Sequence, residues 1–359
     1  MTLLMKRVIA IADRAALVSL KLLAALNLLF FLSFLVVLLL AMGKAHAEAP
    51  VCAGSDLLST LQKDDPAAYA RIETEAAATL NGKGLLWKLE KAGEKPSFLF
   101  GTMHMTDPRV TTLPPAAQKA YDAAGTIIIE TTDVLDKQKM MEAMLKEPEL
   151  MMFTDSTTLS SLLSPQDLAV VNKGLDARGI PPASVSKMKP WLLSAMVALP
   201  VCEVARQAGG APVLDVKLAE DAKADGKPVE GLETAAGQLR AMASLPIAFH
   251  IKGLVETLKL GDKINDINET MIVLYQRGDT GTFWPLLRSM SPGEEDDAAG
   301  YAAFEQAMVT DRNKVMVDHA QPILAKGNAF MAVGALHLPG PEGLIEDFRK
   351  AGYTVTAVD

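Results

Sequence analysis

The sequence lacks the features that mark several large classes of protein. It has a single apolar run long enough to span a membrane, which excludes a multi-pass membrane protein. It has no basic stripe interleaved with aromatics, and its net charge of -8 argues against a nucleic-acid-binding protein that works by counterion release. No internal repeat, low-complexity tract or long linker is present. The composition is that of a globular protein, 50% hydrophobic and 22% charged, so global disorder and a collagen-like fibre are excluded.

The first 47 residues have the pattern of an export signal. They carry a net charge of +4, so the other 312 residues carry -12. An uncharged apolar run covers residues 22–42, and Ala45-His46-Ala47 follows as a small-x-small site for signal peptidase. We predict cleavage after Ala47. The alternative is an uncleaved anchor, because the run spans about 31 Å as a helix. Either way, residues 48–359 form one domain in the periplasm, with membrane contact only through the N-terminal segment.

Cysteine is scarce, with two residues in the whole chain. In an oxidising compartment the pair Cys52 and Cys202 predicts one disulfide that ties the start of the mature chain to a mid-chain helix. Closing a loop of this length stabilises the fold by roughly 4–5 kcal/mol on the chain-entropy model. The alternative is two free, buried thiols.

Short apolar segments alternate with helical patterns at both ends of the domain and surround a helix-rich middle. This order predicts an α/β fold with a helical insertion over residues 134–206. The segment 126–129 is apolar on both faces, which is typical of a central strand. We also expect an acidic loop over 291–299 and a single long helix over 301–325. The other expected strands cover residues 85–90, 97–100, 228–232, 329–333 and 353–358, and a helix is expected over 113–124.

Distinctive polar residues follow four of these strands. Two strands run into Gly-x-x-His segments that end at His104 and His337, and two end in Glu130 and Glu233. In open α/β sheets, ligands bind outside the carboxyl ends of the strands. Two neutral imidazoles and a carboxylate form a suitable set of ligands for a divalent metal, and a second carboxylate can serve as general base. A lone Gly-x-x-His also occurs in ordinary loops, and residues 43–46 match it inside the predicted signal segment.

Two further polar residues lie on the apolar face of the expected helix over 301–325. Arg312 needs a partner there, because a buried unpaired charge is costly. It can clamp a substrate carboxylate or carbonyl oxygen, orient Glu130, or form a structural ion pair. His319 shares the stripe, and we expect it to be a core histidine that is bonded to the backbone.

These residues occur in segments that resemble the TraB/GumN family, which is related to the Tiki metalloproteases. The resemblance spans most of residues 85–359 and rests on the segments LLWKLE, SFLFGTMHMTDPRVTTLP, TIIIETTD, LDVKLAEDAKADGKPVEGLET, DRNKVM and FMAVGALHLPGPEGLIEDFRKAGYTVTAV. It implies a mixed central sheet flanked by helices, and a manganese- or cobalt-dependent hydrolase; zinc also suits the ligands. The family's pattern falls on Gly101/His104, Gly334/His337, Glu130 and Arg312, and Glu233 also resembles a family position.

Three functional hypotheses follow. The leading one is an exported metal-dependent hydrolase of the peptidase type, acting on a peptide or small molecule. In it His104, Glu130 and His337 hold the metal, Glu233 is the base or orients a ligand, and Arg312 stabilises the oxyanion. The second is a periplasmic binding protein for a peptide or signal molecule, as in family members linked to pheromone shutdown or exopolysaccharide gene clusters. The third is a metal-free, esterase-like hydrolase, whose rate a chelator would not change.

Overall fold

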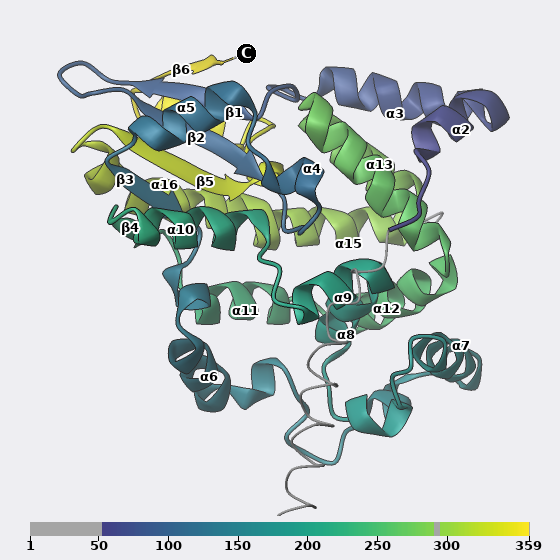
Figure 1. Cartoon of the computed structure of the whole chain (residues 1–359). Coiled ribbons are helices and arrows are strands. Elements are labelled where there is room, and N and C mark those ends of the chain that lie inside the picture. The colour runs from purple at the N-terminus through teal and green to yellow at the C-terminus, as the bar shows by residue number, and fades with distance from the viewer. Residues whose placement is uncertain (1–51, 291–294, 359) are drawn as a thin grey trace, which may run out of the picture. The chain divides into compact units, whose positions relative to one another are not determined.

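The described part of the chain contains a six-stranded sheet, in the order β4-β3-β5-β2-β1-β6 (Figure 1). The computed structural model describes residues 52–290 and 295–358, so the predicted signal segment and its cleavage site lie outside it. Strands β2, β3, β4 and β5 run parallel, while β1 is antiparallel to both of its neighbours. The predicted mixed α/β sheet is therefore confirmed. The strands are β1 (Leu86–Glu90), β2 (Ser97–Thr102), β3 (Thr126–Ile129), β4 (Val229–Gly231), β5 (Ala329–Gly334) and β6 (Thr354–Ala357).

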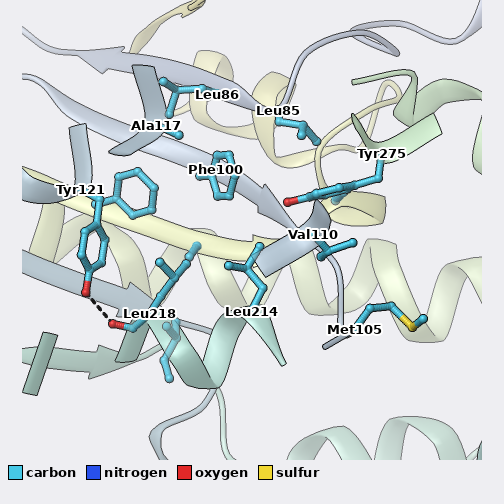
Figure 2. Packing of buried hydrophobic residues seen from close by; sticks show 14 of the residues in the cluster. Leu85, Leu86, Phe100, Met105, Val110, Ala117, Tyr121, Leu214, Leu218 and Tyr275 are labelled. Atoms are coloured by element: carbon cyan, nitrogen blue, oxygen red, sulfur yellow. Dashed lines mark hydrogen bonds between the residues drawn. The ribbon is translucent and has the colours of Figure 1, made fainter. Parts of the chain in front are cut away.

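Alternation along the strands divides their side chains between two hydrophobic clusters. Phe100, Ile127 and Phe330 face α5 (Pro115–Ala123) and α10 (Leu214–Ala224). Their neighbours Leu99, Ile128 and Met331 face α16 (Asp311–Leu324) and α17 (Leu344–Lys350). Because successive strand side chains point to opposite faces, both sides of the sheet are buried. Figure 2 shows the first cluster, where the Tyr121 hydroxyl donates a 2.7 Å hydrogen bond to the Leu218 carbonyl and links α5 to α10.

The predicted helical insertion over residues 134–206 is present and shares a small separate core with α12. Leu175 of α7, Leu193 of α8 and Leu254 of α12 are fully buried against one another. The other helices are α2 (Leu57–Asp64), α3 (Pro66–Ala78), α4 (Pro108–Thr111), α6 (Lys137–Lys146), α7 (Pro165–Asp176), α8 (Pro190–Val197), α9 (Val201–Ala208), α11 (Ala235–Ala243), α12 (Ile247–Leu260), α13 (Lys263–Arg277), α14 (Phe283–Ser289) and α15 (Glu295–Glu305). Short 3-10 turns are η1 (Thr132–Leu135), η2 (Pro148–Leu150), η3 (Leu159–Leu162), η4 (Pro182–Val185), η5 (Thr280–Thr282) and η7 (Ala335–His337).

Three expectations about helix boundaries were wrong. The single helix over 301–325 is interrupted by a π-helical turn, η6 (Gln306–Thr310), between α15 and α16. The acidic loop over 291–299 is already helical from residue 295, since EDDAAGYAAFE begins with acidic residues and is rich in alanine, both of which favour a helix start. The helix expected over 113–124 begins only at Pro115, because Pro114 occupies the cap position in an extended conformation.

The predicted disulfide joins Cys52 to Cys202, with the Cα atoms 5.3 Å apart. It links the chain just before α2 to the first turn of α9, as the cysteine pair indicated. A stable disulfide indicates an oxidising compartment. Among residues 52–290 and 295–358, no helix has the length and apolar character needed to cross a membrane.

Candidate metal centre

The two Gly-x-x-His segments lie side by side because β2 and β5 are adjacent parallel strands. Thr102, near the end of the first segment's strand, pairs with Gly334 at the end of β5. A Cβ added to Gly101 would lie only 3.1 Å from the Cα of Ala335, so glycine permits the two segments to approach this closely. Parallel pairing thus brings together two histidines that are far apart in sequence.

Glu130 joins the histidines from the end of the neighbouring strand β3. The Gly334 amide donates a 2.8 Å hydrogen bond to its Oε1 atom, and the same oxygen lies 3.9 Å from Nε2 of His337. A Cβ built on Gly334 would lie 3.2 Å from Oε1 of Glu130 and 4.0 Å from Nε2 of His104. Because Gly334 has no side chain, a small space remains next to two possible metal-ligand atoms, Oε1 of Glu130 and Nε2 of His104.

His337 is buried and its tautomer is fixed by Asn313. Nδ1 of His337 lies 2.7 Å from Oδ1 of Asn313, whose amide nitrogen donates to the carbonyls of His337 and Glu342 at 3.2 and 2.8 Å. The Asn313 oxygen must therefore accept, so the proton is on Nδ1 and Nε2 keeps its lone pair. Burial lowers the pKa of His337 to about 4, which keeps the ring neutral near pH 7.

His104 is held by Asp215, a residue of α10. Its Nδ1 atom donates to Oδ2 of Asp215 at 2.8 Å, and the Thr102 hydroxyl donates to the other Asp215 oxygen. The Asp215 charge raises the pKa of His104 to about 10, so the free ring is protonated. Metal binding at Nε2 would consequently release a proton.

Asp215 can be regarded either as a metal ligand or as a partner of His104. His104, Glu130 and Asp215 each have one possible metal-ligand atom, and these three atoms lie within 4.8 Å of one another. Asp215 is therefore an alternative to His337 as a ligand. Both Asp215 oxygens already accept hydrogen bonds, from Thr102 and His104. We therefore assign Asp215 to orienting His104, as carboxylates commonly do for ligating histidines.

Arg312 connects Glu130 to Glu233. Its Nη2 atom donates to both, at 2.8 and 2.7 Å, and its Nε donates to Glu233 at 3.1 Å. Its Nη1 atom donates to the carbonyl of Met308 inside the π-helical turn η6. The arginine therefore neutralises two buried carboxylates, and one Nη1 hydrogen has no partner among the described residues. Burial favours a raised pKa for Glu130. At the low pH where Glu130 titrates, however, His337 and His104 are both protonated, and their charges with that of Arg312 lower its pKa to about 2.

The outer side of Arg312 faces a groove of about 560 Å³ between α11 and α16. Glu233, Arg312, Ala241, Val315 and His319 are among its lining residues. His319 is exposed there and donates from Nδ1 to the Leu232 carbonyl. The expected backbone bond is present, but the expected core position was wrong. The reason is that His319 lines the groove beside Leu232, which follows the edge strand β4.

The polar cluster consists of His104, Glu130, Asp215, Glu233, Gln238, Arg312, Asn313 and His337. Three of its residues were not singled out in the sequence: Asp215, Asn313 and Gln238. Gln238 donates to Glu130 at 3.0 Å and to Glu233 at 3.3 Å. A signal existed for the other two, because each is a polar residue on a helix stripe that is otherwise apolar. Asp215 shares its stripe with Leu218 and Ala222, and Asn313 shares one with Met316 and Ala320.

Comparison with known proteins places the chain. The model of the TraB/PrgY/gumN family matches residues 85–357. The chain belongs to the TraB/PrgY/gumN family. The matched segment of this TraB/PrgY/gumN protein contains the whole sheet and every residue of the cluster, but not α2, α3 or Cys52.

A more distant similarity is to a curated vertebrate protein, Metalloprotease TIKI2 of Danio rerio. The two are 23% identical over 320 residues, which cover 75% of this chain and 60% of that protein. The TraB/PrgY/gumN chain therefore spans about 60% of the length of that relative. No solved structure matches the chain at a significant level.

Proposed function

We propose that the chain is an exported, divalent-metal-dependent hydrolase that cleaves peptide bonds. One observation carries the proposal: His104, Glu130 and His337 converge at adjacent strand ends, and in both rings Nδ1 is occupied by a hydrogen bond. Each Nε2 is thereby directed away from its structural partner and is available as a ligand. The similarity to a protein named as a metalloprotease supports the same chemistry.

The donor set suits a metal of intermediate character. Two imidazole nitrogens and a carboxylate oxygen are typical ligands of zinc, cobalt or manganese, and three protein ligands leave a position open for water or substrate. The chemistry that a divalent metal supplies at such a site is polarisation of a substrate carbonyl and acidification of water. The side chains fit this group because the absence of a Cβ on Gly334 leaves space beside Glu130 and His104.

The remaining charged residues take complementary roles in this proposal. The unpartnered Nη1 hydrogen of Arg312 is available to a developing oxyanion, while Nη2 holds Glu130 in place. Oε1 of Glu233 accepts only from Nε of Arg312 among the described contacts, so it retains a lone pair that can take a proton. Glu233 is therefore the general base of the proposal.

A peptide would lie in the groove between α11 and α16. The groove adjoins Arg312 and Glu233, and small or apolar residues such as Ala241, Ala307 and Val315 line it. Its charged members are all paired, Arg312 with Glu233 and Asp311 with Lys314, so the groove favours an uncharged segment. The disulfide agrees with export, and the basic, then apolar N-terminal sequence makes the periplasm our proposed location.

The test is turnover of an unbiased peptide library by the purified chain. We expect new amino termini to appear with manganese, cobalt or zinc, and to disappear after chelation. Glu233→Gln should abolish cleavage yet retain metal, because it keeps the size of the side chain and loses the base. Cleavage that survives chelation would replace this proposal with a metal-free hydrolase.

Ligand capture without turnover is a second candidate, and one observation favours it. Both oxygens of Glu233 accept hydrogen bonds from Arg312, which ties up the proposed base. A capture protein would retain its peptide ligand after chelation and would cleave nothing in the library with any metal.

A further inference from the structure

Glu203 is a fully buried carboxylate that lies outside the metal centre. It is 0% exposed in the first turn of α9. Its Oε1 accepts from the Thr106 amide at 2.7 Å and from Gln207 at 3.0 Å, and its Oε2 accepts from the Thr106 hydroxyl at 2.8 Å. Burying a carboxylate is costly unless hydrogen bonds satisfy it. Here two of the three hydrogen-bond donors belong to one residue, Thr106, and the nearest positive charge is Nη1 of Arg206, 3.9 Å from Oε2.

Thr106 is two residues beyond His104 in the segment that joins β2 to α4. Met105, between them, is buried in the main hydrophobic cluster (Figure 2). The next residue, Asp107, pairs with Arg206 of α9 at 3.4 Å. The backbone that carries His104 is therefore anchored by Met105 in the hydrophobic cluster and by Thr106 and Asp107 on α9.

The disulfide acts on the same end of α9. Cys202 directly precedes Glu203 and is bonded to Cys52, outside the helix. A cross-link at the first turn restricts movement of that turn, and with it of the Glu203 carboxylate. A continuous connection runs from the disulfide through Glu203 and Thr106 to His104.

We propose that Glu203 is a positioning residue for His104, and that the Cys52–Cys202 disulfide holds Glu203 in place. The inference rests on the proposed function, in which His104 binds the metal. Two consequences follow. Loss of the Glu203 contacts weakens metal binding, and reduction of the disulfide weakens it by the same route.

The test measures cobalt affinity and the visible spectrum of the cobalt complex, using the full chain in mild detergent. Glu203→Ala is expected to weaken binding up to about 10-fold, the lower end of the loss for a direct partner of a ligand, because Glu203 acts on His104 through Thr106. Glu203→Gln is expected to restore most of the affinity. Its oxygen can accept from the Thr106 amide, and its NH2 group can donate to the rotated Thr106 hydroxyl.

Two controls separate positioning from general destabilisation. Val197→Ala removes a fully buried side chain from the separate cluster around Leu193, so it should lower stability without changing cobalt affinity. The double variant Cys52→Ser/Cys202→Ser should weaken cobalt binding in the wild-type background, with little further loss when combined with Glu203→Ala. Equal losses in Val197→Ala and Glu203→Ala, or full additivity with the cysteine variant, would overturn the proposal.

A metal-free readout keeps this test independent of the proposed function. In protein labelled with ¹⁵N-histidine, the His104 ring signals are identified by their absence in His104→Gln. Glu203→Ala should shift or broaden them and leave the His250 signals unchanged. If the wild type binds no metal, the proposed function fails. The positioning role is then judged on these spectra alone, and unchanged His104 signals would refute it.

Discussion

Oδ1 of Asn313 lies 2.7 Å from Nδ1 of His337, and both residues are buried. The Asn313 amide group also spans two carbonyls, so the side chain cannot turn over without losing both of these bonds. One residue thus fixes the tautomer and the ring plane of His337. Asn313 is therefore a positioning residue of the proposed metal centre.

Replacement of Asn313 by Ala should lower metal affinity about 10- to 100-fold. It should also lower stability by about 1–3 kcal/mol, because a buried imidazole N–H loses its acceptor. Isothermal titration calorimetry with manganese measures the metal affinity, and urea unfolding measures the stability. Asn268→Ala is the matched control, since Asn268 also donates to two carbonyls but lies outside the cluster. Equal metal affinity in both variants would refute the role of Asn313.

Replacement of Gly334 by Ala should block the centre with little effect on the fold. Its φ of -51° suits any L-residue, so no backbone strain arises. The new Cβ would lie 3.2 Å from Oε1 of Glu130 and so displace that oxygen. We expect metal binding to be lost while the melting temperature stays within a few degrees of wild type. Gly253→Ala, whose Cβ would meet open space, should bind metal normally.

Replacement of Arg312 by Ala should destabilise the protein by about 3–5 kcal/mol, because it leaves Glu130 and Glu233 buried without their partner. Lysine should recover only part of the loss, since it cannot donate to both carboxylates in the same planar arrangement. Arg240→Ala removes a comparable but exposed pair with Glu147 and should leave stability unchanged. Urea unfolding of the three variants distinguishes the cases, and similar losses in Arg312→Ala and Arg240→Ala would show that the buried cluster is not special.

The metal-free protein should lose stability on both sides of about pH 6.5. The pKa of His104 is raised to about 10, so its pair with Asp215 stabilises fully below 6.5 and is lost as pH rises toward 10. The pKa of His337 is lowered to about 4. As pH falls from 6.5 toward 4, the His337 ring therefore gains a proton in the unfolded chain before it does in the folded protein, and the folded protein loses stability. The melting temperature should be measured as a function of pH. Its fall above pH 6.5 should disappear in His104→Gln, and its fall below pH 6.5 should be smaller in His337→Gln. The same pH dependence of melting temperature in the wild type and both variants would contradict these pKa shifts.

Local patterns were sufficient to predict the scaffold, because short apolar runs next to a glycine, such as residues 126–129 and 329–333, favour buried strands over helices. Short Gly-x-x-His segments following such strands also indicated where His104 and His337 would lie. Asp215 and Asn313 could not be identified as partners, since their role depends on which helix covers which strand end. The π-helical turn before Arg312 was missed for a related reason: EQAMVT has no local signal that distinguishes it from an ordinary helix.

The central claim is that His104 and His337 bind one divalent metal, and direct metal analysis tests it best. The wild type would be purified beside His104→Ala/His337→Ala, with His319→Ala as a control that removes an exposed histidine outside the cluster. After exposure to manganese, cobalt or zinc and removal of excess ion, we expect about one metal per chain in wild type and His319→Ala, and none in the double variant. No bound metal in the wild type with any of the three ions, or equal metal content in the double variant, would contradict the account.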